Sequence, residues 1–298
     1  MKGHITDKKK KSEKKGAVKR IFLGALLIGI GALILGGCGS STEETQSEQE
    51  KTASAKKEDD KIQIGLTVDS FVIERWIRDR DVFVATAREM GADVNVQDAG
   101  ADAKEQISQI EYFISKQVDV IVVIARDCGA LSDVIQKAQN AGIPVISYDR
   151  MINNSNTNLY ISFDNRKVGE IMAQALIDAI PQGGDIFMIQ GSSTDNNVHM
   201  LKKGFDDVLK NSDLNVVYEA NCEGWMAELA EGYMEEALEK YPHVKGIMCG
   251  NDDIASQVVE VLAENQMAGD VIVVGQDGDL AACQRIVEGT QYMTAFKP

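Results

Sequence analysis

Residues 118–150 read VDVIVVIARDCGALSDVIQKAQNAGIPVISYDR. Two runs in this stretch, at 118–125 and 143–148, are apolar and of strand length, and residues 129–141 between them have the amphipathic spacing of a helix. A strand, a helix and a second strand in this order are typical of a βαβ unit, in which the two strands run parallel. The stretch therefore predicts a parallel sheet with helices packed on it.

The same alternation continues along the chain from residue 61 to residue 288 and falls into two similar series. The first series has predicted strands at 61–68, 92–97, 118–125 and 143–148, separated by predicted helices at 74–90, 102–117 and 129–141. The second series has predicted strands at 158–163, 184–190, 214–220, 244–250 and 270–276, which alternate with predicted helices at 165–180, 194–210, 225–240, 252–266 and 278–288. Each series has the size of a doubly wound domain, so the predicted fold class is α/β, with two doubly wound parallel-sheet lobes.

The N-terminus has the composition of an export signal. Residues 1–20 carry nine Lys or Arg against two acidic residues, and residues 21–37 carry no charge. The apolar run ends in LGGCGS, which resembles a bacterial lipobox and implies cleavage before Cys38 and a lipid on its thiol. We expect a signal peptide at 1–38, and an uncleaved membrane anchor is the alternative. In both cases the rest of the chain lies outside the cytoplasm.

Residues 39–60 are predicted to form a disordered tether. Between residues 40 and 60 there is no Val, Ile, Leu or aromatic residue, so this segment cannot bury enough apolar surface to fold. The folded part of the chain is therefore expected to begin at residue 61.

Composition and motifs argue against several classes of function. The formal net charge of −15 opposes a nucleic-acid backbone, so no nucleic-acid partner is expected. No glycine motif of the kind that binds phosphate follows a predicted strand, so we expect neither an enzyme nor a cofactor. The cysteines after the tether have no metal-type or CxxC spacing, and we expect no metal, no disulfide and buried side chains for Cys128, Cys222, Cys249 and Cys283.

Polar side chains follow the carboxyl ends of the predicted strands, which is where open parallel sheets bind their ligands. These side chains belong to Thr67, Asp69, Asp149, Arg150, Asp195, Asn196, Asn197, Asn251, Asp252, Gln276 and Asp277. Carboxylates, carboxamides and a guanidinium together donate and accept hydrogen bonds in pairs, as adjacent hydroxyl groups require. The chain's two tryptophans, Trp76 and Trp225, lie near predicted helix starts at strand ends and offer flat faces for the C–H side of a sugar. The pattern favours a sugar as the ligand.

Eight segments of the chain carry a more specific resemblance. They are ERWIRDRDVF, YDRMIN, YISFDNRKVGE, STDNN, EGW, CGNDD, VVGQDGDLAACQRI and GTQYMTAFKP. In this order and spacing they resemble the D-xylose-binding proteins of bacterial ABC sugar importers, which are type I periplasmic binding proteins related to the ribose- and galactose-binding proteins. The resemblance covers residues 61–298 and rests on the eight segments together, because each alone is weak.

The resemblance implies two α/β lobes joined by a hinge, with an N-terminal lobe at 61–163, a C-terminal lobe at 164–291 and a returning hinge strand at 292–298. A monosaccharide, D-xylose or a related pentose, would lie in the cleft as the lobes close on it. The protein would then deliver the sugar to the transmembrane subunits of an ABC permease. The alternative is a membrane-tethered sugar sensor that signals to a histidine kinase or a chemoreceptor, because both use the same cleft.

The resemblance also implies which residues contact the sugar. They are Arg75, Trp76, Asp149 and Arg150 from the first lobe, Asp195, Asn197, Trp225, Asn251 and Asp277 from the second lobe, and Lys297 at the returning hinge. On this view, Asp149 and Arg150 form a clamp for hydroxyl groups at a strand end. Neighbouring polar residues are expected to be helix caps and hinge contacts, namely Asp164, Asn165, Asp252 and Asp253.

Two features of the chain depart from the family pattern. The predicted strand at 118–125 is followed by Arg126 and Asp127 where an uncharged turn is expected, so these residues are expected to change the rim of the cleft. The chain also stops at FKP where the family pattern continues, so the last helix of the first lobe is expected to be missing. An apolar sheet face would then be open to water, at a cost of about 25 cal/mol for each Å².

Overall fold

The structure is a computed structural model, and it describes residues 61–297. The predicted signal peptide with Cys38 and the predicted tether at 39–60 lie outside the described residues, so both stay predictions. Among the helices that the structure describes, none has both the length and the apolar character needed to cross a membrane.

The stretch at 118–150 folds as predicted. It forms β3 (Val120–Ile124), α3 (Ser132–Asn140) and β4 (Val145–Tyr148), and the two strands pair in parallel. Side chains of β3 alternate between the two faces of the sheet, with Val122 in one apolar cluster and Val123 in another. Because side chains on both faces are buried, the strand is apolar at successive positions rather than at every second one.

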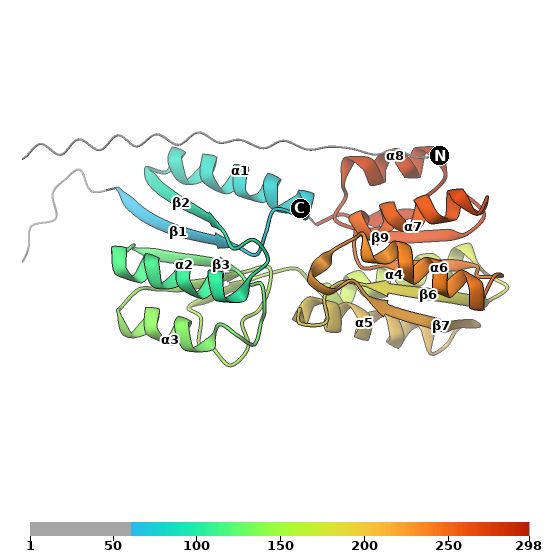
Figure 1. Ribbon diagram of the computed structural model, residues 1–298, viewed down its shortest axis with the longest axis horizontal. Coiled ribbons are helices and arrows are strands. Elements are labelled where there is room, and N and C mark those ends of the chain that lie inside the picture. Colours follow the sequence, from blue (N-terminus) through green and yellow to red (C-terminus); the bar gives the residue numbers. More distant parts are fainter. Residues whose placement is uncertain (1–60, 298) are drawn as a thin grey trace, which may run out of the picture. The chain divides into compact units, whose positions relative to one another are not determined.

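β3 and β4 belong to a five-stranded parallel sheet with the order β2-β1-β3-β4-β5. The other strands are β1 (Ile62–Val68), β2 (Ala92–Asp98) and β5 (Leu159–Ile161). The helix α1 (Glu74–Glu89) lies on one face of this sheet, and α2 (Ala103–Lys116) lies with α3 on the other face (Figure 1). We call the part of the chain built on this sheet the first lobe.

The second lobe is built on another five-stranded parallel sheet, with the order β10-β9-β8-β6-β7. Its strands are β6 (Gly184–Gln190), β7 (Leu214–Asn221), β8 (Gly246–Cys249), β9 (Ile272–Gln276) and β10 (Met293–Ala295). Its helices are α4 (Asn165–Ala179), α5 (Asn196–Leu209), α6 (Leu229–Lys240), α7 (Asp252–Glu264) and α8 (Leu280–Glu288). α4 and α5 pack on one face of the sheet, and α6 and α7 pack on the other.

Two glycines allow α4 and α5 to pack in close contact. A Cβ atom at Gly169 of α4 would overlap the carbonyl oxygen of Leu201 in α5, and a Cβ atom at Gly204 of α5 would overlap that of Arg166 in α4. The helices therefore approach with their backbones in contact, which only glycine permits. This packing positions the N-terminus of α5, where two of the predicted site residues lie.

The structure corrects the start of one predicted helix and the burial of one cysteine, and it shows where the predicted hinge strand pairs. The helix predicted at 225–240 begins at Leu229, because the backbone of Trp225 is left-handed (φ 59°) and ends a short 3₁₀ turn at Glu223–Trp225. The returning hinge strand predicted at 292–298 contains β10, which pairs with β9 as an edge strand of the second sheet. Cys283 is exposed on α8 rather than buried, whereas the cysteines buried as predicted are Cys128, Cys222 and Cys249.

Candidate functional site

One pocket is lined by side chains from both lobes. The first lobe supplies residues from the start of α1 and from the end of β4, and the second lobe supplies residues from the start of α5 and from the ends of β7 and β9. The lining residues are Ile73, Arg75, Trp76, Asp149, Arg150, Asn165, Asp195, Asn197, Trp225, Gln276, Asp277 and Lys297. Nine of the ten sugar-contacting residues predicted from the sequence are among them, so the structure brings together residues that are far apart in the chain.

The remaining predicted residue, Asn251, caps a helix instead of lining this pocket. It is fully buried, and its side chain accepts a hydrogen bond from the Ile254 N–H at 3.0 Å at the start of α7. The sequence predicts caps or hinge contacts at Asp252 and Asp253. Neither caps α7, because both lie in its first turn and the extended backbone that a cap requires falls at Asn251. Asp252 does contact the predicted hinge segment, since its Oδ2 accepts a hydrogen bond from Thr294 Oγ1 at 2.6 Å. Asp164 caps α4 as predicted.

Asp149 and Arg75 form a buried ion pair at the pocket. Arg75 Nη2 lies 2.8 Å from Asp149 Oδ2, and Asn197 of the second lobe donates through Nδ2 to Asp149 Oδ1 at 2.7 Å. Burial alone would raise the pKa of Asp149, but Arg75, Lys297 and Arg150 together lower that pKa below its ordinary value. Asp149 is therefore a carboxylate that accepts hydrogen bonds.

Arg150 is enclosed between carboxylates of the two lobes. Its Nη1 lies 2.6 Å from Asp69 Oδ2 and donates to the carbonyl of Ala125 at 2.9 Å, while its Nε lies 2.8 Å from Asp195 Oδ2 of the second lobe. Burial would lower the pKa of Arg150, but Asp195 and Asp69 raise it above its ordinary value, so the guanidinium stays charged. Asp149 and Arg150 are adjacent in the sequence, yet each is half of a different ion pair.

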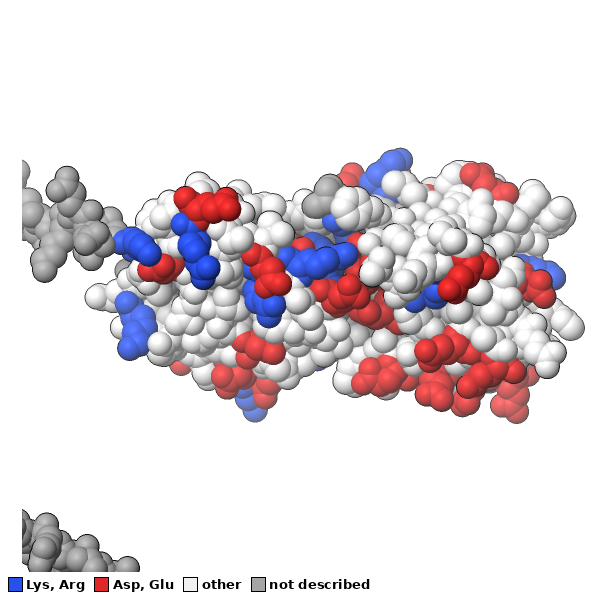
Figure 2. All heavy atoms as spheres, turned by 90° about the horizontal axis from the view of Figure 1, so that it is seen from above, with Lys and Arg blue, Asp and Glu red and all other residues white. Residues whose placement is uncertain are grey.

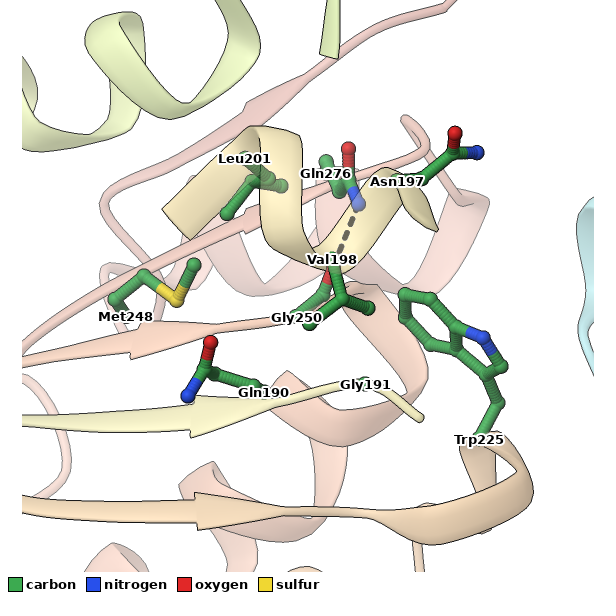
Figure 3. A pocket seen from close by; sticks show the side chains of 9 residues that line it. All are labelled: Gln190, Gly191, Asn197, Val198, Leu201, Trp225, Met248, Gly250 and Gln276. Carbon is green, nitrogen blue, oxygen red and sulfur yellow. Dashed lines mark hydrogen bonds between the residues drawn. The ribbon is translucent and has the colours of Figure 1, made fainter. Parts of the chain in front are cut away.

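Both tryptophans lie next to the Arg150 guanidinium. Its central carbon is 5.5 Å from the ring centroid of Trp76 and 5.8 Å from that of Trp225, distances at which a cation is attracted to a ring face. Trp225 Nε1 also donates to Asp195 Oδ2 at 3.2 Å. The Trp225 ring extends toward the backbone at Gly191 (Figure 3), where any Cβ atom would overlap it. Glycine at position 191 therefore leaves the space that the Trp225 ring occupies.

Three of the lining residues have a left-handed backbone although they are not glycine. The φ angles are 62° at Asp149, 59° at Trp225 and 107° at Asp277. Such angles are uncommon for residues with a side chain and cost about 1 to 3 kcal/mol each, so they persist only where the surrounding structure holds them. Strained residues of this kind concentrate at binding sites, which agrees with the position of these three around one pocket.

Buried polar atoms without a hydrogen bond concentrate in the pocket. Within residues 61–297, ten buried side-chain atoms have no hydrogen-bond partner, and six of them belong to lining residues. These six are the donors Arg75 Nη2 and Trp76 Nε1 and the acceptors Asp149 Oδ2, Asn197 Oδ1, Gln276 Oε1 and Asp277 Oδ1. Three of the six lie in ion pairs without the angle of a hydrogen bond: Arg75 Nη2 and Asp149 Oδ2 are 2.8 Å apart, and Asp277 Oδ1 is 2.7 Å from Lys297 Nζ. The other three, Trp76 Nε1, Asn197 Oδ1 and Gln276 Oε1, have neither a hydrogen bond nor an ion pair within residues 61–297. Buried polar atoms are nearly always bonded, so this mixed set fits a ligand with several hydroxyl groups.

Charges around the pocket are matched. The nearest carboxylate lies within 2.8 Å of each of the three cationic lining residues, Arg75, Arg150 and Lys297. Figure 2 shows basic and acidic side chains next to one another in the middle of the face that it presents. No cluster of His, Cys, Asp or Glu in the described part of the chain could hold a metal ion. The pocket therefore suits a neutral ligand.

Three lining residues, Ile73, Asn165 and Gln276, are not among the sugar contacts predicted from the sequence. The sequence predicts a cap or hinge contact for Asn165, and the structure places this residue both at the start of α4 and in the pocket. Gln276 donates through Nε2 to the carbonyl of Gly250 at 2.6 Å, so its Oε1 points the other way (Figure 3). The sequence does mark Gln276 as a polar residue at the end of an apolar run, where a ligand is expected to bind.

Arg126 and Asp127, the residues that depart from the family pattern, have different roles. Arg126 contacts the second lobe, since a Cβ atom at Gly224 would lie 2.7 Å from its Nη2. Its Nε is also 3.6 Å from Asp69 Oδ1. Asp127 instead accepts a hydrogen bond from the Gly129 N–H at 2.7 Å, within its own turn. Of the two, only Arg126 reaches across the rim.

Four carboxylates gather at the end of β9 and the start of α7. They belong to Asp252, Asp253, Asp277 and Asp279, and the Asp279 N–H donates to Asp252 Oδ2 at 3.1 Å. Burial, together with Asp277, Asp252 and Asp253, raises the pKa of Asp279 to about 7, and Arg78 opposes this rise. Holding Asp279 ionised in this cluster is therefore unfavourable near neutral pH.

Asp279→Asn is expected to raise the free energy of unfolding near pH 8 and to lose this advantage toward pH 4. The folded-state pKa of about 7 exceeds the ordinary 3.8, so stabilisation by the protonated acid is complete below about pH 4 and is lost as the pH rises through about 7. Asparagine stays neutral throughout. Urea unfolding of both chains between about pH 4 and pH 8 measures the difference, and a difference that does not change with pH contradicts this assignment.

Comparison with known proteins places this geometry in a family. Residues 64–298 match the periplasmic binding protein domain. The chain is 42% identical over 242 residues to the D-xylose-binding periplasmic protein of Haemophilus influenzae, covering 80% of this chain and 73% of that protein. It is 41% identical over 242 residues to the protein of the same name in Escherichia coli, with the same shares covered.

Solved structures agree with this match. An ABC transporter solute-binding protein from Actinobacillus succinogenes with bound D-allose superposes with a TM-score of 0.73 at 28% identity, covering 78% of this chain and 84% of that chain. One from Clostridium phytofermentans with bound β-D-glucose also has a TM-score of 0.73 at 28% identity, covering 79% of each chain. The chain therefore belongs to the periplasmic binding protein family.

Family membership confirms the fold class predicted from the sequence, two parallel-sheet α/β lobes. It also confirms that the protein is a binding protein rather than an enzyme. The family implies a location outside the cytoplasm, as the export signal predicts.

Proposed function

We propose that the chain captures D-xylose in the pocket between its two lobes and delivers it to the transmembrane subunits of an ABC permease. The observation that carries this proposal is the set of six buried polar atoms that line one pocket without a hydrogen bond, three of which also have no ion pair. Support for D-xylose comes from the D-xylose-binding relatives, which are 41% and 42% identical to this chain. Support for transport comes from the ABC transporter proteins among the solved structures.

Each of these six atoms has a role in this proposal. The carboxylates and amides of Asp149, Asp277, Asn197 and Gln276 accept hydrogen bonds from hydroxyl groups, and Arg75 and Trp76 donate to hydroxyl oxygens. Trp76 and Trp225 contact the C–H faces of the ring. Arg150 and Lys297 keep the carboxylates charged and in place.

Sugar entry requires the lobes to separate. The cavity volume is about 20 Å³, roughly the room of one water molecule, because ion pairs and tryptophan rings fill the space between the lobes. A sugar would enter an open cleft, and its hydroxyl groups would take the place of side chains that now contact one another. Hinge closure of this kind is a common mechanism of ligand capture by two-domain proteins.

We infer in addition that a lipid on Cys38 anchors the protein to the cell membrane. Support comes from the basic start, the uncharged run at 21–37 and the LGGCGS ending. The segment at 39–60 would then hold the sugar-binding lobes at a distance from the membrane surface.

D-xylose is expected to stabilise the full chain more than D-ribose, L-arabinose, D-glucose or D-galactose at equal concentration. At about 1,000 times Kd, a ligand that binds only the folded state adds roughly 4 kcal/mol to the free energy of unfolding. A thermal-shift series with the five sugars measures this. A response to another sugar and none to D-xylose would reject the choice of D-xylose but keep the class of ligand. No response to any of the five would reject the proposed function.

A further inference from the structure

The first turns of α1 contact both lobes. Arg75 and Arg78 are three residues apart and therefore project from the same side of the helix. Arg75 is buried in the pocket, whereas the side chain of Arg78 is 42% exposed and does not line that pocket. Arg78 Nη2 reaches the second lobe, where it donates to Asp279 Oδ1 at 3.0 Å and to the carbonyl oxygen of Asp277 at 3.4 Å. The Arg78 guanidinium therefore binds both the residue before Gly278 and the residue after it.

The ionised form of the acceptor carboxylate is stabilised by this cation. Asp279 is buried, its Oδ2 has no hydrogen-bond partner within residues 61–297, and it faces the acids Asp277, Asp252 and Asp253. Arg78 is the cation that acts on it. Separation of the lobes would remove Arg78 and leave Asp279 among like charges, so the contact favours the closed arrangement.

The same contact fixes Asp277, which the proposed function places on the sugar. Asp277 has the largest of the left-handed φ angles among the non-glycine residues described, 107°. Its N–H donates to the carbonyl of Ala295 at 2.9 Å, and the Gly278 N–H donates to Thr294 Oγ1 at 3.0 Å, both within the second lobe. Arg78 binds the carbonyl of Asp277 from the first lobe. The strained residue is therefore held from both lobes only while they are closed.

We propose that Arg78 is a latch, a positioning residue outside the pocket that holds the lobes closed on the ligand and fixes Asp277 against it. The proposal rests on the proposed function, since a latch acts on a sugar that the closed lobes enclose. Because the contact forms only after closure, its loss raises the rate of sugar dissociation and leaves the association rate unchanged.

Arg80 provides a matched control on the same helix. Its guanidinium pairs with Asp81 at 2.7 Å and lies 4.8 Å from the centroid of the Phe71 ring, so its contacts stay within the first lobe. Arg80→Gln and Arg78→Gln remove the same charge from α1. The two variants differ in that Arg78→Gln also breaks a contact between the lobes.

Stopped-flow measurement of D-xylose binding to the full chain tests the latch. Arg78→Gln is expected to speed dissociation about tenfold, equal to about 1.4 kcal/mol, and to change association less than about twofold. Arg78→Lys should recover part of the loss, because an ammonium keeps the charge that pairs with Asp279 but lacks the planar geometry of the guanidinium. Adding Asp279→Asn to Arg78→Gln should have little further effect on dissociation. Equal dissociation rates in Arg78→Gln and Arg80→Gln would overturn the proposal.

Acrylamide quenching of tryptophan fluorescence without sugar gives a second test that does not depend on D-xylose. The chain has two tryptophans, Trp76 and Trp225, one on each lobe and both buried at the pocket. Arg78→Gln is expected to increase quenching relative to Arg80→Gln, because the lobes open more often. If D-xylose does not bind the unchanged chain, the proposed function is wrong, but the quenching experiment still tests the latch. Equal quenching in Arg78→Gln and Arg80→Gln would overturn the latch.

Discussion

Arg150→Ala is expected to lower the free energy of unfolding by about 3 to 5 kcal/mol and to weaken D-xylose binding by roughly a hundredfold or more. Arg150 is 2% exposed and holds Asp69 and Asp195, which are 1% and 2% exposed. Removing the guanidinium leaves two carboxylates buried without their cation, which is far more costly than the loss of a surface pair. Affinity falls because Asp195 then no longer holds the Trp225 indole in place.

Urea unfolding without sugar and calorimetric titration with D-xylose measure the two effects separately. Arg150→Lys should restore part of each, since an ammonium keeps the charge but cannot bond to both carboxylates with planar geometry. Arg166→Ala is the control, because Arg166 is half exposed and its pairs with Asp207 and Glu170 lie on the surface, where such pairs contribute about 0 to 1 kcal/mol. If Arg150→Ala keeps both the stability and the D-xylose affinity of the unchanged chain, Arg150 does not belong to the site.

Gly169→Ala is expected to destabilise the second lobe by about 2 to 4 kcal/mol. The new methyl group would overlap the backbone carbonyl of Leu201 in α5. This backbone cannot move aside unless α5 separates from α4. Since α5 begins next to Asp195 and includes Asn197, its displacement should also weaken sugar binding.

Gly232→Ala supplies the matched control for this change. Gly232 lies in α6, where a Cβ atom would meet nothing within 4 Å. The same substitution should therefore stabilise the chain by about 0.5 to 1 kcal/mol, because alanine loses less backbone entropy in a helix. Thermal unfolding of both variants should give shifts of opposite sign, and shifts of the same sign would contradict the close packing of α4 and α5.

The alternation of strands and helices in the sequence predicts the fold, and the strand ends predict half of the residues that line the pocket. In a parallel sheet the strand ends share one edge, so a polar residue after an apolar run can be assigned to that edge without knowledge of the rest of the fold. Asp149, Asp195 and Asp277 were found in this way. The tryptophans needed the resemblance to a family, because an isolated Trp in a sequence is as often part of a core.

The details that the sequence did not predict depend on contacts between distant parts of the chain. The partners of Arg150 lie 81 residues before it and 45 residues after it, and no local pattern marks them. The position of the Trp225 ring depends on the space left by Gly191, 34 residues earlier in the chain. The contact of Arg78 with Asp279 spans 201 residues and exists only because the two lobes meet.

Equilibrium dialysis of the full chain against radiolabelled D-xylose tests the proposed function most directly. Retention of one D-xylose per chain, displaced by excess unlabelled D-xylose, reduced in Arg150→Lys and reduced further in Arg150→Ala, is the predicted result. A chain that unfolds cooperatively, and so is folded, but retains neither D-xylose nor any of the other four sugars would contradict sugar capture between the two lobes.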